Sequence, residues 1–335
     1  MRIIVDAMGG DNAPQEIIKG CIQALETLNV HIILVGQQEV IHKELKKYTY
    51  PKEKVEIRHA SQVITNDDIP TKVIKEKKDA SMVVGFKMLK EKEGDAFVSA
   101  GNTGALLSGA LLKVGRIKGV HRPALTPIFP TEKGCAILVD AGANTHCRPE
   151  NFLQFGIMGS TYMEKVEAIK NPSVGLVNVG TEAGKGTDLT KEAFSLLKNA
   201  HINFFGNIES REIPVGNIHV IVCDGFVGNV ILKLMEGMGL TFYSEIKKIF
   251  TKNPITYLSA LLVKKGLKSF KKKMDYREHG GAPLLGIDGA VIKAHGSSNA
   301  LSIYYTILQA QKFVDTGVIE EIRQNMTQEA KANEY

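Results

Sequence analysis

The chain has 335 residues, of which 44% are hydrophobic and 23% charged, so it is long and apolar enough to bury a sizeable core. Its four cysteines form no C-x-x-C pair and stand at no zinc-ligand spacing to a histidine, which argues against a zinc module and favours unpaired thiols in a reducing compartment. The apolar run at the start is too short for a secretory signal, and the longest uncharged stretch is broken by glycines. We therefore expect a cytoplasmic protein without a spanning helix.

The positive charge of the chain is concentrated in one segment. The net charge is +6 at pH 7, yet residues 246–274 contain nine lysines and no acidic residue, and removing those lysines leaves −3 for the rest. A uniformly basic surface would indicate nucleic acid, whereas one lysine-rich segment on a mildly acidic body indicates a membrane surface or one acidic partner. We therefore expect no nucleic acid among the partners.

Apolar runs rich in β-branched residues alternate with helical patterns along the chain. Most of these runs are nearly continuous hydrophobic stretches, which is typical of parallel strands covered on both faces. The predicted strands span residues 2–5, 31–35, 55–59, 96–99, 136–140, 174–179, 203–205 and 219–223. A proline-bounded segment at 123–130 predicts an edge strand or an extended arm.

The predicted helices lie between these strands, at residues 14–28, 38–47, 80–92, 103–115, 150–168, 190–199, 226–250 and 296–315. The first has a start signal, with Asn12 as N-cap, Pro14 in the first turn and Gln15 three residues after the cap. The alternation predicts a mainly parallel sheet in a three-layer α/β/α architecture, with ligands at the carboxyl ends of the strands. We expect residues 1–335 to form a single α/β catalytic domain, with two lobes as the alternative.

Glycine-rich loops with polar side chains follow most of the predicted strands. They lie at residues 6–11, 99–104, 140–144, 179–186, 206–211, 224–229, 280–286 and 295–298. Because the carboxyl ends of parallel strands meet at one edge of a sheet, these loops can face a common cleft, where Lys185, Arg211 and His295 supply charge. The clearest loop is 101–104, which opens a predicted helix whose backbone N–H groups attract phosphate.

Each of these loops also has a plainer interpretation. A Gly-Asn or Asp-Gly pair often forms only a turn, and Lys185 can be a solvated loop lysine. His295 can be a hydrogen-bonded core histidine, and Asn229 can cap the helix that follows it. Asp6 and Asp11 are more often turn or capping residues than catalytic acids. The concerted pattern of loops is what favours a binding site.

As a set, the loop sequences resemble the bacterial acyl-acyl carrier protein:phosphate acyltransferases of phospholipid synthesis, over residues 1 to about 315. The motifs that carry the resemblance are DAMGGD at 6–11, SAGNTGA at 99–105, DAGAN at 140–144, NVGTE at 178–182 with KG at 185–186, GNIE at 206–209, DGFVGN at 224–229 and HGSS at 295–298. Two positions depart from the family pattern: Ala141 and Ser210 stand where a larger aliphatic residue and a glycine are more common. Neither change removes a reactive group.

The resemblance implies that a long acyl chain moves from the phosphopantetheine thioester of acyl carrier protein to inorganic phosphate, giving an acyl phosphate. It also implies that no cofactor or metal takes part. The implied fold is similar to the isocitrate and isopropylmalate dehydrogenases and the phosphotransacetylases, and the implied assembly is a homodimer. A downstream membrane acyltransferase is a further expected partner.

Phosphate itself is the nucleophile in such a reaction, so the enzyme must hold it against the thioester carbonyl and stabilise the developing oxyanion. A leaving thiol of pKa about 8.5 needs no strong general acid. We therefore predict two catalytic residues: Lys185, which contacts phosphate, and Asn229, which polarises the carbonyl. The predicted substrate-binding residues are Gly101, Asn102, Thr103, Gly104, Asn144, Arg211, Asp224, His295, Ser297 and Ser298.

The lysine-rich segment at about 246–275 predicts an amphipathic helix or a helical hairpin. Such a surface can insert leucines at a bilayer boundary while its lysines meet anionic head groups, at about 1 kcal/mol per lysine. This predicts reversible attachment to the inner face of the cell membrane, with contacts from Leu258, Leu261, Leu262, Lys264, Lys265 and Lys268. The alternatives are a dimer-packing helix with a solvated lysine face, and attraction of the acidic acyl carrier protein.

Two other functions fit part of the pattern. A phosphotransacetylase-like enzyme, which moves short acyl groups between coenzyme A and phosphate, shares the phosphate chemistry and the expected fold group. A membrane-associated scaffold could bind acyl carrier protein without catalysis. The lysine-rich apolar segment argues for a lipid pathway over the first, and the number of glycine-flanked polar loops argues against the second.

Overall fold

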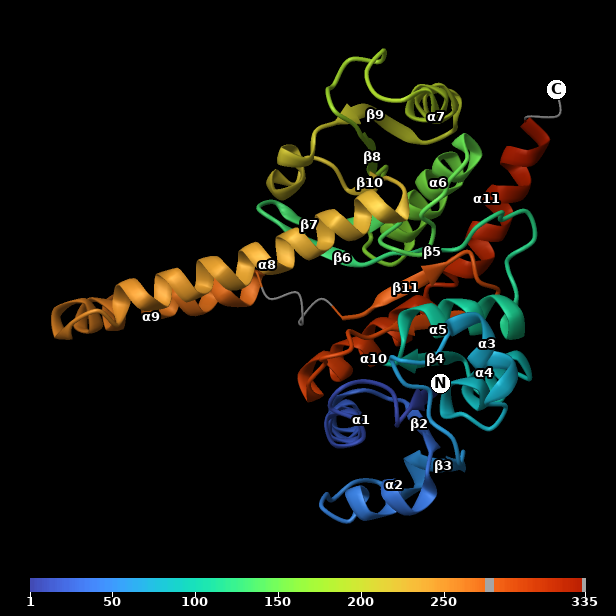
Figure 1. Cartoon of the computed structure of the whole chain (residues 1–335), viewed down its shortest axis with the longest axis vertical. Coiled ribbons are helices and arrows are strands. Elements are labelled where there is room, and N and C mark those ends of the chain that lie inside the picture. The colour runs from blue at the N-terminus through green and yellow to red at the C-terminus, as the bar shows by residue number, and fades with distance from the viewer. Residues whose placement is uncertain (275–279, 333–335) are drawn as a thin grey trace.

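The computed structural model describes residues 1–274 and 280–332, which form two β-sheets with helices packed around them (Figure 1). The first sheet, within these residues, has seven strands in the order β3-β2-β1-β4-β12-β11-β5. Its strands are β1 (Arg2–Asp6), β2 (His31–Gly36), β3 (Val55–His59), β4 (Ala96–Ser99), β5 (Ala124–Leu125), β11 (Ala282–Leu285) and β12 (Ala290–Lys293). All neighbours pair in parallel except β11, which is antiparallel to both β12 and β5.

The second sheet has five strands among the described residues, in the order β6-β7-β10-β8-β9. They are β6 (Ile128–Thr131), β7 (Gly134–Val139), β8 (Ser173–Val177), β9 (Asn203–Ile208) and β10 (Val220–Val222). The edge strand β6 is antiparallel to β7, and the other neighbours are parallel. The proline-bounded segment 123–130 therefore ends in an edge strand, as its sequence predicts.

Eleven α-helices and three short helical turns connect the strands in the part of the chain that is described. The helices are α1 (Gln15–Thr27), α2 (Gln38–Leu45), α3 (Pro70–Glu76), α4 (Ser81–Lys90), α5 (Thr103–Gly109), α6 (Pro149–Lys165), α7 (Asp188–Asn199), α8 (Gly225–Phe250), α9 (Pro254–Met274), α10 (Ala300–Asp315) and α11 (Val318–Ala332). The turns are η1 (Lys52–Lys54), η2 (Ala110–Val114), which continues α5, and η3 (Ser210–Val215).

The first sheet is buried on both faces, as its continuous apolar strands predict. Alternate residues of β1 belong to different core clusters: Ile3 packs with the cluster that contains α1 and α10, and Ile4 packs with the cluster that contains α3 and α4. Phe97 of β4 packs against Phe86 of α4, with ring centroids 4.8 Å apart. This arrangement confirms the predicted three-layer α/β/α class and mainly parallel pairing.

All eight predicted strands and all eight predicted helices are present, but the strands are divided between two sheets. Sequence reasoning missed α3, α11, β11 and β12, although β12 lies in the interior of the first sheet. The predicted N-cap role of Asn12 is wrong. Helix α1 begins at Gln15 without a side-chain cap, and the Asn12 amide instead donates to the backbone carbonyls of Ser297 and Ser298, at 3.2 Å each.

Helices α8 and α9 form a hairpin that projects from the body of the molecule (Figure 1). The predicted segment 246–275 covers the end of α8, the turn and all of α9, so the structure adopts the hairpin form of that prediction. Residue 275 and the side chains of Leu261 and Lys268 lie outside the described part of the chain. No helix in the described ranges is long and apolar enough to cross a membrane.

Candidate functional site

A cavity of about 460 Å³ lies between the two sheets and is lined by residues from both. The first sheet contributes residues that follow the carboxyl ends of β4 and β12, and the second sheet contributes the loop after β7 and the first turns of α8. The volume is within the range of small-molecule sites. The cavity therefore lies at the carboxyl ends of strands from both sheets, where the sequence predicts ligands to bind.

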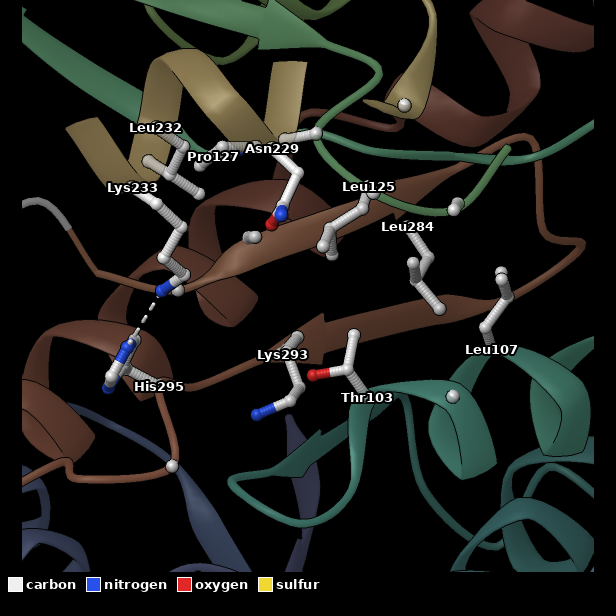
Figure 2. Close-up of a pocket in the computed structure, with 18 of the residues that line it drawn as sticks. Thr103, Leu107, Leu125, Pro127, Asn229, Leu232, Lys233, Leu284, Lys293 and His295 are labelled. Atoms are coloured by element: carbon white, nitrogen blue, oxygen red, sulfur yellow. Dashed lines mark hydrogen bonds between the residues drawn. The ribbon is translucent and has the colours of Figure 1, made fainter. Parts of the chain in front are cut away.

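One wall of the cavity is apolar. Leu107 of α5, Leu125 of β5 and Leu284 of β11 project into it (Figure 2). Pro127, just before β6, and Leu232 of α8, next to Lys233 in the chain, also line the cavity. Such a wall accommodates hydrocarbon and excludes water from the polar groups beside it.

The opposite end of the cavity is polar and carries positive charge. Lys233, Lys293 and His295 lie there with Thr103, while Asn229 reaches toward the cavity from α8 (Figure 2). The Lys233 ammonium lies 3.5 Å from His295 Nε2 and 2.7 Å from a carboxylate oxygen of Glu236. Desolvation, assisted by the charge of Lys233, lowers the pKa of His295, so this imidazole is held toward its neutral form.

The turn that enters α5 is held by a buried carboxylate beneath it. The Ser99 hydroxyl donates to Asp6 Oδ2 at 2.7 Å, and the Gly101 amide donates to Ser99 Oγ at 3.0 Å. Asn102 caps α5, because its side-chain oxygen accepts from the Ala105 amide at 2.9 Å. Only Thr103 and Gly104 of the predicted 101–104 loop line the cavity. Gly101 and Asn102 therefore stabilise the turn through these hydrogen bonds without lining the cavity.

A second buried carboxylate organises the loop after β7. Asp140 accepts hydrogen bonds from the amides of Leu125, Ala143 and Asn144, at 2.9, 3.1 and 2.6 Å. The Asn144 side chain donates to Asp140 at 3.0 Å and to the Pro123 carbonyl at 2.7 Å. Asn144, a predicted substrate-binding residue, is therefore buried in the support of the loop and does not line the cavity.

The start of α8 presents Asn229 to the cavity. Asp224 is the N-cap of this helix, since its carboxylate accepts from the amides of Phe226 and Val227 at 2.9 Å each. The alternative that Asn229 caps the helix is therefore wrong: it lies inside the first turns of α8. Gly228 packs against the carbonyl oxygen of Asp140, which brings the helix close to the loop after β7.

The predicted site residues fall into three groups. Those that line the cavity are Thr103, Gly104, Asn229 and His295. Those that lie next to the lining residues in the chain or in the hydrogen-bond network are Gly101, Asn102, Asn144, Asp224, Ser297 and Ser298. Within this second group, the Ser297 hydroxyl lies 2.8 Å from His295 Nδ1, and Ser298 is buried. Lys185 and Arg211 form the third group and are not among the lining residues.

Lys185 lies on the loop that follows β8, Arg211 lies in the turn η3 that follows β9, and both are exposed. Arg211 is 81% exposed in its side chain and pairs with Glu209 at 2.5 Å. The strand order explains their position, because β10 separates β8 from β7, and β9 lies beyond β8. The expectation that Lys185, Arg211 and His295 face one common cleft assumed a single sheet. Because the strands form two sheets, His295 lines the cavity while Lys185 and Arg211 lie away from it.

Sequence reasoning missed two lysines of the cavity, Lys233 and Lys293. Lys233 is one turn beyond Asn229 on α8, and Lys293 is the last residue of β12. A signal for Lys293 was available: it directly follows the apolar run 290–292 and precedes the HGSS motif. In the part of the chain described, no group of three His, Cys, Asp or Glu side chains is placed to hold a metal ion.

Solved structures with the same architecture define the fold class. A phosphotransacetylase from Streptococcus pyogenes superposes with a TM-score of 0.65 at 15% identity, covering 93% of this chain and 94% of that one. A 4-hydroxythreonine-4-phosphate dehydrogenase from Klebsiella pneumoniae superposes with a TM-score of 0.52 at 14% identity, covering 94% and 98%. At these identities the similarity establishes the fold alone, and it confirms the predicted fold group.

Sequence comparison identifies the family. Residues 1–321 match the family model described as "Fatty acid synthesis protein". The phosphate acyltransferase of Alkaliphilus oremlandii is 57% identical over 327 residues, 98% of each chain, and that of Acetivibrio thermocellus is 53% identical over 97% of this chain and 96% of its own. The chain belongs to this family of phosphate acyltransferases, and the resemblance found in its loop sequences is confirmed.

Proposed function

We propose that this enzyme transfers a long-chain acyl group from the thioester of acyl carrier protein to inorganic phosphate, forming an acyl phosphate for phospholipid synthesis. The observation that carries the proposal is the cavity itself. Its apolar wall suits a hydrocarbon chain, and its cationic end suits an oxyanion. Family membership supports phosphate acyl transfer as the chemistry.

The reaction needs little covalent help from the protein. An oxygen of hydrogen phosphate attacks the thioester carbonyl carbon and a carbon–oxygen bond forms. The carbon–sulfur bond breaks with its electron pair leaving on sulfur, and the thiolate takes up one proton for the one that hydrogen phosphate loses. We assign the carbonyl to the Asn229 amide, whose N–H donors stabilise the oxyanion as it develops. Thr103, Gly104 and His295 line the place of the phosphate. No cofactor or metal has a role in this scheme.

The test is to incubate the purified protein with palmitoyl-acyl carrier protein, with and without phosphate, and to look for acyl phosphate by mass spectrometry. Loss of thioester that requires phosphate and yields acyl phosphate is the expected result. Activity with acetyl-coenzyme A alone would instead support a phosphotransacetylase, the second candidate, whose fold this chain shares. If neither substrate reacts, the result would support the non-catalytic scaffold that binds acyl carrier protein.

We further propose that the enzyme is cytoplasmic and binds the inner face of the membrane reversibly through the α8–α9 hairpin. Leu258 and Leu262 are 65% and 87% exposed, and Lys264 and Lys265 are exposed on the same helix. Exposed leucines beside lysines suit the boundary of an anionic bilayer, where a downstream membrane acyltransferase would take the product.

Vesicle flotation with anionic liposomes tests the membrane proposal. Leu258→Glu/Leu262→Glu is expected to abolish flotation, because two charges replace the inserting side chains. Leu301→Glu, at an exposed leucine on α10, is the matched control and is expected to float like the unchanged protein. Unchanged flotation of the double variant would refute the proposal.

A homodimer is proposed on separate grounds. Helix α8 exposes Leu234, Leu240 and Phe242 by more than half of their surface, and apolar side chains in such numbers usually meet a protein surface. Size-exclusion chromatography with light scattering tests this. A dimer that dissociates in Leu234→Glu/Phe242→Glu is expected, and a monomer at all concentrations would contradict the proposal.

A further inference from the structure

The cavity contains one lysine that is almost completely buried. Lys293 is 7% exposed and ends strand β12, in an otherwise apolar stretch of the sheet. Its side chain lines the cavity on the same side as Thr103 (Figure 2). Transfer of an ammonium group from water into a protein interior is costly unless an anion compensates it. A buried lysine that faces a cavity therefore indicates an anionic ligand.

The surroundings of Lys293 lower its pKa but leave it positively charged at neutral pH. Burial lowers its pKa to about 8, with a further lowering effect of Lys233 on α8, while the carboxylates of Asp6 and Asp11 oppose this. His295 also faces this end of the cavity, and its pKa is lowered. At pH 7 Lys293 is thus mostly protonated in a weakly solvated site, where a cation attracts an anion strongly.

The Lys293 ammonium also has N–H donors with which it can bind a ligand. An ammonium group has three N–H donors. Among the described residues, the Lys293 ammonium makes one hydrogen bond, to the carbonyl oxygen of Ala294. Two donors therefore remain for a ligand. Lys233, by contrast, is 53% exposed in its side chain and already pairs with Glu236, and Lys185 is exposed outside the cavity.

We propose that Lys293 binds the phosphate nucleophile in the cavity, in the role that the sequence alone assigns to Lys185. The inference rests on the proposed function for the identity of the anion as inorganic phosphate. Asp6 is a positioning residue in this arrangement. It is 2% exposed, holds the Ser99 hydroxyl beneath the 101–104 turn, and raises the pKa of Lys293. One buried carboxylate thus supports both the turn and the ammonium group.

The first test compares steady-state kinetics of Lys293→Met and of the unchanged enzyme, with palmitoyl-acyl carrier protein and inorganic phosphate varied separately. Methionine keeps the length of the side chain and removes the charge. We expect KM for phosphate to rise at least tenfold and KM for the acyl carrier to change less than twofold. Lys293→Arg should recover part of the loss, and Lys198→Met, at an exposed lysine of α7, should match the unchanged enzyme.

A rise in KM for the acyl carrier alone would overturn the proposal, since it would place the phosphodiester of the carrier's prosthetic group, not inorganic phosphate, on Lys293. Unchanged kinetics would overturn it as well.

The second test uses the unchanged protein, so it does not depend on the folding of a variant. Lysines are acetylated with limiting acetic anhydride at pH 8, and each site is quantified by mass spectrometry with and without inorganic phosphate. We expect phosphate to protect Lys293 at least threefold and to leave Lys198 unaffected. Equal labelling of Lys293 in both samples would reject the phosphate site. Because labelling needs no turnover, protection without acyl transfer would refute the proposed function and keep the phosphate site.

Discussion

Lys293 and Ser99 are register partners on the neighbouring parallel strands β12 and β4. Ser99 in turn donates its hydroxyl to the buried carboxylate of Asp6 on β1, which pairs with the other edge of β4. The lysine at the polar end of the cavity and the residue that supports the 101–104 turn are therefore fixed by backbone pairing in the interior of the sheet. Their relative position does not depend on a surface loop.

This arrangement predicts an alkaline limit to activity. Lys293 is charged below its pKa of about 8 and neutral above it, so phosphate binding should weaken as the pH rises. We expect kcat/KM for phosphate to fall about tenfold per pH unit above the break, since this ratio reports ionisation of the free enzyme. The measurement is a profile from pH 6.5 to 9.5, corrected for thioester hydrolysis without phosphate. A flat profile to pH 9.5 would show that Lys293 does not carry the charge that binds phosphate.

Asp6→Asn should move that break to lower pH. The charge of Asp6 stabilises the Lys293 ammonium, so removing it lets burial depress the lysine pKa further. A purely structural role for Asp6 would reduce kcat without moving the break, and that outcome would contradict the electrostatic coupling. Thermal unfolding of the variant serves as the control for the loss of the Ser99 hydrogen bond.

Much of the fold was predictable because local pattern suffices for it. Strand β1 and its neighbours are runs of apolar residues buried on both faces, and such runs identify parallel strands without knowledge of their partners. Strand β12 was not predicted, because it is only four residues long, lies between glycine-containing segments and ends in a lysine. A short run with a terminal charge resembles a loop as closely as a strand.

The division into two sheets was not predictable, and it decides which candidate site residues meet. Pairing between β12 and β4 joins segments nearly two hundred residues apart, and periodicity in either segment carries no information on such pairing. Several of the predicted motifs contribute residues to the cavity lining, and the observation that Lys293 lines the cavity while Lys185 does not required the three-dimensional order of strands. Asn229 and His295 line the cavity because the start of α8 and the segment after β12 border it.

Asn229→Ala should lower kcat by two to three orders of magnitude, about the loss seen when one oxyanion donor is removed. Alanine is a good helix former, so α8 should stay intact. KM for phosphate should change little, because Asn229 is assigned to the thioester carbonyl. Asn229→Asp is the matched variant: it keeps the shape, removes the amide donors and adds a negative charge, and should be at least as inactive. A kcat within threefold of the unchanged enzyme would reject this role.

Lys185→Ala tests whether the exposed loop after β8 binds phosphate or attracts acyl carrier protein. Because Lys185 is not among the residues that line the cavity, we expect KM for phosphate to stay within twofold of the unchanged enzyme. We expect the loss to appear in KM for acyl carrier protein, whose acidic surface an exposed lysine would attract, and to grow weaker as salt is added. Arg211→Ala, on the adjacent loop, should behave alike. A tenfold rise in KM for phosphate would return Lys185 to the phosphate site.

Gly228→Ala should damage both stability and activity, because a Cβ at this position would overlap the carbonyl oxygen of Asp140 and approach Cys223 Sγ to 3.0 Å. Helix α8 must then shift away from the loop after β7, which moves Asn229 relative to the cavity. We expect a loss of about 1–3 kcal/mol in the free energy of unfolding in urea, the usual cost of overpacking, together with a lower kcat. Gly237→Ala is the control on the same helix. Apart from the adjoining helix backbone, no atom of the described residues lies within 4 Å of its added Cβ, and alanine there should stabilise the helix by about 0.5–1 kcal/mol. Equal stability of the two variants would mean that the close approach of α8 to Asp140 does not exist in solution.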